Sequence, residues 1–233
     1  MLATFDGYCN GLESLSASGD LTVSDLRAGK ARSAGVRIVA RRGGRLYLKG
    51  SVAMVTVLEI VSDGERFWFR LPSKKKIWTG PADSRPPTDD GEEKQEAPYR
   101  ALRPRDVTQA LLPEPLALEA GEVLVFEADP QAFSLALVSL EQGRGRVRRR
   151  VWLDRETLRL ARVRTYDQAG ELESEVRFDA WQEGLPWRVT ISRPQEGYRA
   201  SLVLSKVRPN ARVPDRAFVP RLPEGHELIE IEG

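Results

Sequence analysis

Hydrophobic and polar residues alternate with a period of two along most of this chain, a pattern typical of β-strands that bury one face. Residues 65–71 show the alternation clearly, because Phe67, Phe69 and Leu71 fall on one face while Trp68 and the arginines beside it fall on the other. The same alternation recurs in both halves of the chain. It predicts a sheet with one dry face and one wet face.

The alternating segments predict an antiparallel sheet of many strands. Most of their connections are short and contain Gly, Pro, Asp or Asn, and consecutive strands joined in this way must run antiparallel. Gly43-Gly44 and Asp63-Gly64 are signals for tight turns. Helix is expected only at residues 8–15 and 105–112. The expected strands are residues 21–24, 36–40, 45–49, 52–62, 65–71, 75–79, 123–128, 133–140, 146–153, 158–166, 172–178, 185–193 and 198–207.

The dry face shared by these strands has to be covered. A closed barrel, a sandwich, or a curved sheet with a few helices in its hollow would each cover it. Because little helix is available, a curved sheet would be incompletely filled, and a cavity lined by aliphatic and aromatic side chains would bind apolar ligands. The alternation also fits a fully packed core, so both interpretations stay open at this point.

Residues 81–98 interrupt the alternation. The segment begins and ends with Pro, contains a cluster of acidic residues and lacks large apolar residues. This composition predicts a flexible, Pro-rich acidic loop. Neither half of the chain has enough helix to cover a sheet of its own, so we expect a single domain over residues 1–233.

Composition excludes several classes of protein. The chain has 233 residues and a formal net charge of +2, so a nucleic-acid interface would require a local basic patch. Cys9 is the only Cys, which excludes an internal disulfide, and His226 is the only His, which argues against a His-based triad or a multi-histidine metal site. No spacing pairs two carboxylates as acid and base. We therefore expect no enzymatic activity, no metal and no cofactor.

The densest cluster of charge is the run RGRVRRR, in which alternation places Arg146, Arg148 and Arg150 on one face of a strand. One interpretation is an anion-binding site for phosphate, a lipid headgroup or nucleic acid. The other, which we favour, is a solvated face paired with acidic residues of neighbouring strands, such as Glu173 and Glu175.

Trp68 and Trp78 lie among cations, as the stacking platforms of single-strand binding proteins do. No RNA-binding signature accompanies them, and the net charge is small. Trp68 is better explained by the outer face of a hairpin, where an arginine can stack on its ring. We expect no nucleic-acid partner.

Several segments resemble a known family. The run VSDGERFWFRLPSKKKIWTG resembles a segment of bacterial outer-membrane lipoprotein-sorting proteins, the family of LolA and LolB, in which an apolar strand, Asp-Gly, an aromatic strand, Pro and a Lys-containing turn follow in order. GGRLYLKG resembles the strand before it. VWLDRETLRLARVRTYDQAGELESEVRF, LPWRVTI and LVLSKVRPNARVPDRAFVP resemble the late strands and the tail of the family. The likeness extends from about Ser16 to Pro223.

The resemblance implies an unclosed half-barrel made of a curved antiparallel sheet, with a few short helices on its concave side. It implies a hydrophobic hollow that accepts acyl chains of lipids or lipoproteins, and no enzymatic activity. We expect the inward residues of several strands to contact those chains. They are Leu46, Leu48, Phe67, Phe69, Leu71, Leu135, Trp187, Ile191, Leu202 and Leu204.

The family is exported, so the resemblance also implies a periplasmic or outer-membrane location. We expect a leader, and any lipidated Cys that would attach the protein to a membrane, upstream of Met1. Envelope proteins are possible partners. The alternative is a non-catalytic structural or interaction module of the cell envelope, whose hollow is filled by its own side chains.

Overall fold

The computed structural model describes residues 1–86, 97–141 and 143–231. The chain folds into two compact units, of which unit 1 comprises Met1–Gly11 and Glu114–Gly197 and unit 2 comprises Leu12–Pro113 and Tyr198–Gly233. Unit 2 contains β1 (Ser14–Asp25), β2 (Lys30–Arg41), β3 (Arg45–Val52), β4 (Val55–Asp63), β5 (Arg66–Leu71), β6 (Lys76–Pro81), α2 (Ala97–Arg100), α3 (Pro104–Leu111), β13 (Tyr198–Pro209) and β14 (Glu227–Glu230). Unit 1 contains α1 (Leu2–Asn10), β7 (Glu122–Ala128), β8 (Ala132–Glu141), β9 (Arg144–Asp154), β10 (Leu160–Tyr166), β11 (Leu172–Gln182) and β12 (Leu185–Arg193).

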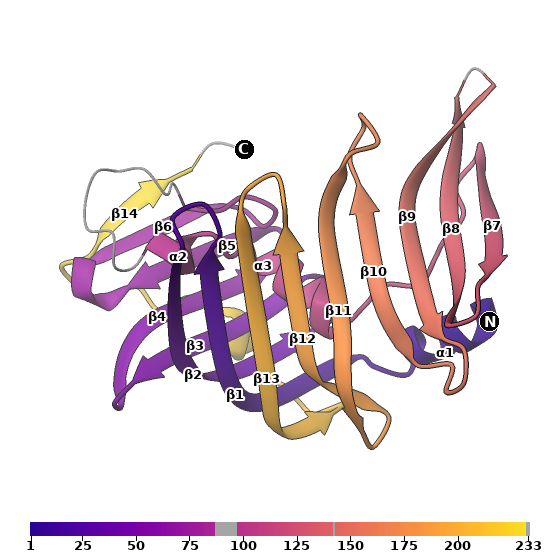
Figure 1. The fold of residues 1–233 in the computed structure, drawn as a ribbon. Coiled ribbons are helices and arrows are strands. Elements are labelled where there is room, and N and C mark those ends of the chain that lie inside the picture. The colour runs from indigo at the N-terminus through magenta and orange to yellow at the C-terminus, as the bar shows by residue number, and fades with distance from the viewer. Residues whose placement is uncertain (87–96, 142, 232–233) are drawn as a thin grey trace. The chain divides into compact units, whose positions relative to one another are not determined.

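The predicted fold class is confirmed as a mainly β protein with a few short helices and a large sheet that is not closed (Figure 1). Hydrogen-bonded neighbours follow the order β14-β6-β5-β4-β3-β2-β1-β13 in unit 2 and β12-β11-β10-β9-β8-β7 in unit 1. Within each unit, consecutive strands of this order pair antiparallel, except that β14 pairs parallel with β6. The single-domain organisation stays a prediction, and residues 87–96 of the predicted flexible loop lie outside the described residues.

Rows of apolar side chains that face one another across the strands form the buried face of unit 2. The register places Ile38, Leu48, Ile60, Phe69 and Trp78 directly opposite one another in turn across β2, β3, β4, β5 and β6. All five side chains are at most 1% exposed. The Phe69 and Trp78 rings meet edge to face with centroids 6.2 Å apart, so Trp78 belongs to the core rather than to an exposed stacking platform.

The hairpin that joins β3 to β4 turns at Ala53 and Met54. Both residues have positive φ angles, of 47° and 68°, in the left-handed region that disfavours side chains with a Cβ. The sequence offers no Gly, Asn or Asp here, and the single strand predicted over residues 52–62 is therefore wrong. The chain forms a separate turn, and β4 begins at Val55.

Two short helices lie against the buried face of unit 2, where α2 contacts β1 and β2 and α3 contacts β2, β3 and β4 (Figure 1). The amphipathic pattern predicted α3 to within a residue at each end, and the helix buries Val107, Ala110 and Leu111. Asp106 lies inside the first turn of the helix. The N-cap residue is Arg103, whose side chain makes no capping bond.

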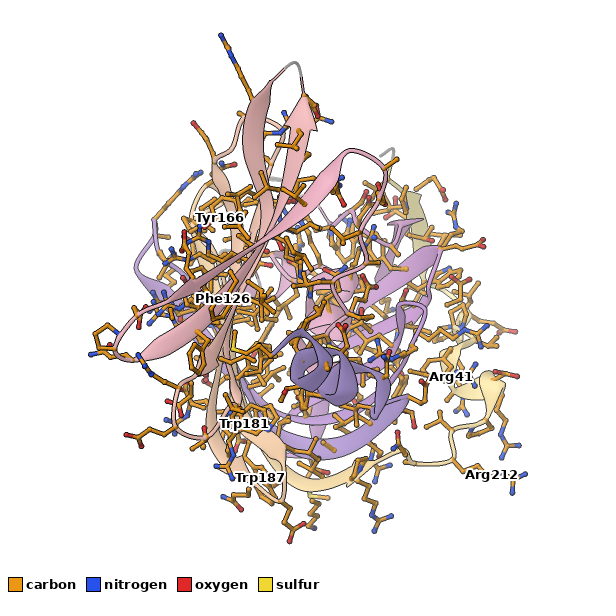
Figure 2. All side chains as sticks on the ribbon, turned by 90° about the vertical axis from the view of Figure 1, so that its right-hand side faces the viewer. Arg41, Phe126, Tyr166, Trp181, Trp187 and Arg212 are labelled. Carbon is orange, nitrogen blue, oxygen red and sulfur yellow. The ribbon has the colours of Figure 1, made fainter. Side chains whose placement is uncertain are left out.

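The first helix differs from the prediction, since it spans Leu2–Asn10 instead of residues 8–15. Its buried residues are Phe5 and Cys9, whose spacing of four places both side chains on one helix face. The Tyr8 ring packs edge to face on Trp181 of β11, with centroids 5.6 Å apart, and Figure 2 shows α1 beside the strands of unit 1. Burial raises the pKa of the Tyr8 hydroxyl well above its ordinary value, and the charge of Cys9 adds to this effect.

Candidate functional site

Apolar strand faces in the two units carry the ten residues predicted to contact acyl chains. Nine of these residues are between 0% and 6% exposed, and Trp187 is half-buried. Their contact with lipid stays a prediction. Unit 2 holds Leu46, Leu48, Phe67, Phe69, Leu71, Leu202 and Leu204, and unit 1 holds Leu135, Trp187 and Ile191.

The outer face of β5 also agrees with the alternation. Arg66 is exposed, and Trp68 and Arg70 are half-buried, while the residues between them are fully buried. The guanidinium of Arg70 donates two hydrogen bonds, of 2.8 and 2.6 Å, to one carboxylate oxygen of Glu59 on β4. The cations of this hairpin are therefore held by acidic partners rather than gathered into a free basic surface.

Buried polar contacts hold α2 and α3 on the apolar face of unit 2. The Tyr198 hydroxyl, on β13, donates a 2.7 Å hydrogen bond to Oδ2 of Asp106 on α3, and both residues are less than 9% exposed. The guanidinium of Arg100, on α2, stacks over the ring of Trp78 with 4.6 Å to the ring centroid, and Arg100 is 2% exposed. Buried groups of this kind define one position for a helix, because they lose their partners when it moves.

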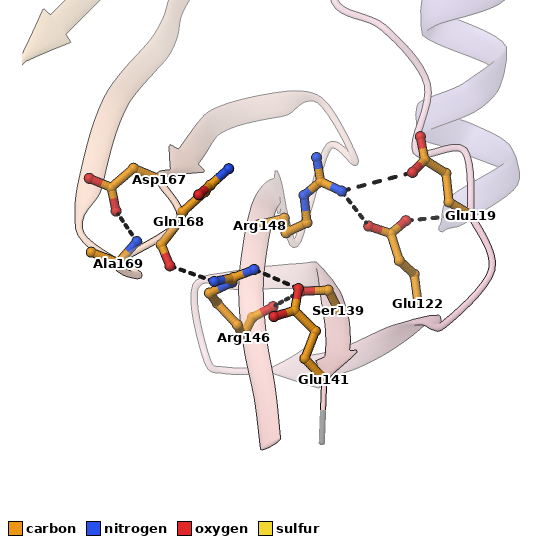
Figure 3. Close-up of polar contacts among 9 residues, drawn as sticks. All are labelled: Glu119, Glu122, Ser139, Glu141, Arg146, Arg148, Asp167, Gln168 and Ala169. Carbon is orange, nitrogen blue, oxygen red and sulfur yellow. Dashed lines mark hydrogen bonds and ion pairs between the residues drawn. The ribbon is translucent and has the colours of Figure 1, made fainter. Parts of the chain in front are cut away.

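Each of the three arginines predicted as an anion site has an acidic partner in unit 1. A guanidinium nitrogen of Arg146 lies 2.7 Å from a carboxylate oxygen of Glu141, and one of Arg148 lies 3.1 Å from a carboxylate oxygen of Glu122. Figure 3 shows both ion pairs. Arg150 lies 2.9 Å from an oxygen of Glu127 on β7. The favoured interpretation of paired charges therefore fits this geometry, although the acids that pair with the arginines come from β7 and β8.

A β-bulge changes which of the arginines share a face. Leu137 and Val138 of β8 pair with Arg149 and Val147 of β9, so Arg148 is an extra residue between them. The single-face alternation of the three arginines is therefore wrong. Beyond the bulge, Arg149 takes the same face as Val151 and Leu153, which are at most 1% exposed.

Glu175 of β11 holds a second charge network, on the wet face of unit 1. The residue is 7% exposed and accepts hydrogen bonds of 2.6 Å from both Arg164 and Arg177. Burial acts to raise the pKa of this carboxyl group, but the two guanidinium groups outweigh burial and lower the pKa below its ordinary value. Arg164 and Arg150 also stack on the Trp152 ring.

The tip of the β3–β4 hairpin is an apolar feature that the alternation missed. Met54 is 99% exposed, Val55 is 66% exposed and Val52 is 47% exposed. Three neighbouring apolar side chains at a strained turn are unusual on a solvated surface. The sequence signal for this exposed tip is the uninterrupted apolar run VAMV. Because the run contains no residues that are typical of turns, its pattern is that of a strand interior.

Groups for metal binding or nucleophilic chemistry are scarce. Within residues 1–86, 97–141 and 143–231, no three or more His, Cys, Asp or Glu side chains are grouped so that they could hold a metal ion. The thiol of Cys9, a residue of α1, is buried.

In the part of the chain that the structure describes, none of the helices is both long enough and apolar enough to cross a bilayer.

Several solved structures share this fold at low sequence identity. A LolA superfamily protein from Nitrosomonas europaea superposes with a TM-score of 0.59 at 12% sequence identity, covering 94% of this chain and 96% of that protein. A domain described as an outer-membrane lipoprotein-sorting protein, from Vibrio parahaemolyticus, gives a TM-score of 0.54 at 14% identity, with 93% and 95% covered. A DUF1329 family protein from Desulfovibrio piger gives 0.55 at 15% identity, with 94% of each chain covered.

These similarities define the class of fold. The chain has the fold of the LolA-like lipoprotein-sorting proteins, as its sequence motifs indicated. No family model matches the sequence, and no curated protein matches it significantly. At 12–15% identity, the structural likeness shows the fold alone.

Proposed function

We propose that this protein is a non-catalytic carrier or receptor that binds acyl chains of lipids or lipoproteins at the periplasmic face of a bacterial envelope. The observation that carries the proposal is the apolar face of unit 2, against which the two short helices α2 and α3 lie. Acyl chains and aliphatic side chains are chemically alike, so an acyl chain is a suitable replacement for the helices on that face. Its fold supports the same class of ligand.

We propose that α2 and α3, together called the cover, can move off the apolar face of unit 2. An isolated helix of eight residues, such as α3, is too short to be stable in water, and its stability comes from packing on the sheet. Its position depends on the Tyr198–Asp106 hydrogen bond and on the buried residues of α3. Displacing the helix would expose apolar residues of β2, β3 and β4, the strands that α3 contacts. This is the step in which we propose that an acyl chain enters.

The hairpin tip supports contact with a membrane. Met54 and Val55 project apolar atoms into solvent at a turn whose backbone is strained, and burial of such atoms in lipid is favourable by about 25 cal/mol per Å². We propose that this tip touches the bilayer from which the ligand comes or to which it goes.

Binding of a fluorescent fatty acid tests the proposal. The purified protein is titrated with cis-parinaric acid, and native mass spectrometry records any lipid that is retained from the host. Tyr198→Phe should take up the probe faster, because it weakens the cover. Tyr47→Phe is the matched control, since its hydroxyl lies 3.2 Å from Glu59 on the outer face of the same sheet. If the wild type, Tyr198→Phe and Tyr47→Phe all retain no lipid and take up no probe, the proposal is wrong.

A second candidate is a structural or interaction module of the envelope with a filled core. The observation that favours it is the complete burial of Leu46, Leu48, Phe67 and Phe69. The edge strand β7 would then be the contact surface, because Phe126 and its neighbours are exposed there and an edge strand can accept a strand from a partner (Figure 2). This function predicts no uptake of the probe and no effect of Tyr198→Phe on binding of a partner.

A further inference from the structure

Two adjacent rows cross the buried face of unit 1, and they differ in chemistry. In the first row, the register places Leu135, Val151, Val163, Val176 and Ile191 directly opposite one another across β8 to β12. Four of these side chains are at most 6% exposed, and Val176 is half-buried. The first row is therefore a continuous aliphatic strip.

The second row contains three polar residues and one leucine. The same registers place Leu137, Arg149, Thr165 and Ser174 opposite one another across β8 to β11. All four are half-buried, whereas most of the aliphatic row is fully covered. Side chains directly opposite on neighbouring strands have Cβ atoms about 5 Å apart, so Arg149, Thr165 and Ser174 are successive neighbours in one row.

The β-bulge at Arg148 puts a cation into this row. Without the extra residue, the alternation that runs from Arg146 would turn Arg149 to the wet face. Bulges of this kind re-aim side chains and are common beside functional sites. The neighbouring arginines are fully engaged, since Arg146 bonds to Glu141 and to the carbonyl of Gln168, and Arg148 bonds to Glu122 (Figure 3).

Arg149 differs from these neighbours. Within residues 1–86, 97–141 and 143–231, its guanidinium has no hydrogen bond or ion pair, and the hydroxyl groups of Thr165 and Ser174 have no hydrogen bond either. Burial lowers the pKa of Arg149, while the charges of Glu114 and Cys9 act in the opposite direction. A partly desolvated cation beside two free hydroxyl donors is an incomplete hydrogen-bonding site, which an oxyanion would complete.

We propose that Arg149, Thr165 and Ser174 bind the anionic group of an acyl lipid, a carboxylate or a phosphate, next to the aliphatic row of unit 1. The proposal rests on the proposed function, because it identifies the ligand as an anionic lipid. The guanidinium provides charge-assisted hydrogen bonds, the hydroxyls add further donors, and the aliphatic row takes apolar atoms. The anion itself could come from a lipid or from free phosphate, and the experiment separates these sources.

Three probes are compared on wild-type protein and on Arg149→Gln. They are cis-parinaric acid, its methyl ester, which keeps the chain and removes the charge, and inorganic phosphate, which has the charge and no chain. Wild-type protein should bind the acid at least about tenfold more tightly than the ester, and Arg149→Gln should remove this difference while leaving affinity for the ester unchanged. Arg149→Lys should restore part of the preference.

Arg188→Gln is the matched control, because Arg188 is an exposed arginine on β12 of the same unit. It should keep the preference of the wild type for the acid. Thermal denaturation of Arg149→Gln should show no loss of stability, since the guanidinium has no bonded partner to lose; a large loss would indicate a structural role and overturn the proposal.

The remaining outcomes decide between the anion site and the proposed function. Equal binding of acid and ester by the wild type would overturn the anion site and leave acyl-chain binding intact. Binding of inorganic phosphate alone, lost in Arg149→Gln, would support the anion site with free phosphate as its source. Binding of none of the three probes would overturn both proposals.

Discussion

Replacing Tyr198 by Phe should selectively loosen α3, and this change measures how firmly the cover of unit 2 is held. The substitution removes one hydroxyl and keeps the ring, which is 2% exposed. What is lost is the 2.7 Å hydrogen bond to Asp106, a residue that is 8% exposed. The rest of the packing between α3 and the sheet is unchanged.

The magnitude follows from the chemistry of that bond. A hydrogen bond to a charged group contributes about 1.5–3 kcal/mol, and the buried carboxylate loses a donor when the hydroxyl is removed. If α3 opens as a local unit, the free energy of opening falls by this amount, and the protection of its amides against hydrogen exchange falls about 10- to 150-fold. Hydrogen exchange measured by NMR or mass spectrometry reports the amides of Val107 to Leu112 directly.

The pattern of the loss matters more than its size. Amides of β11 and β12, in unit 1, should keep their protection in Tyr198→Phe. Tyr47→Phe should leave α3 unaffected, because its bond to Glu59 lies on the outer face. Unchanged protection of α3 in Tyr198→Phe, or an equal loss in every strand, would refute the reasoning that this bond holds a separately movable cover.

Two further substitutions test other parts of the account. Met54→Asn should reduce co-sedimentation of the protein with phospholipid vesicles, because Met54 is 99% exposed. Its melting temperature should not fall, since Asn tolerates the positive φ of 68° at this position. Unchanged vesicle binding would contradict the proposed contact between the hairpin tip and a membrane. Glu175→Gln should lower the stability of unit 1 to denaturant by about 1–3 kcal/mol at pH 7. Because the pKa of Glu175 is lowered in the folded state, its contribution is present above the unfolded pKa and is lost as pH falls through the folded pKa. The gap between wild type and variant should therefore narrow as denaturation experiments are repeated at progressively lower pH, and a gap that is independent of pH would contradict the assigned pairing.

The strand pattern could be predicted because successive side chains of a half-buried strand alternate between the buried and the solvated face, and the sequence alternates with them. Phe67, Phe69 and Leu71 are all buried, and the residues between them are exposed or half-buried. The turn at Ala53 and Met54 could not be predicted in this way, because its residues lack the usual preference for positive φ. At Asp63-Gly64 only Gly64 has a positive φ, of 108°, while the Asp63 carboxylate accepts hydrogen bonds from the next turn amides.

The candidate sites were harder to predict, because they depend on pairing between strands that are distant in sequence. Alternation indicated that Leu48 and Ile60 face inward, but not that α3 lies against their strands, β3 and β4. A run of arginines shows that charge is present, but a single bulge decides that Arg149 turns to the dry face and Arg150 does not. No local sequence pattern predicts a bulge of this kind, because the bulge depends on pairing with another strand, where Leu137 lies opposite Arg149.

Photo-cross-linking with a diazirine-labelled fatty acid tests the central claim most directly. After irradiation and proteolysis, mass spectrometry identifies the residues that touch the acyl chain. Labels are expected on the β3 and β4 peptides that contain Leu48 and Ile60, with more label in Tyr198→Phe than in Tyr47→Phe. Labels confined to exposed residues such as Met54, or no labels above those on a denatured control, would contradict the claim that this face receives an acyl chain.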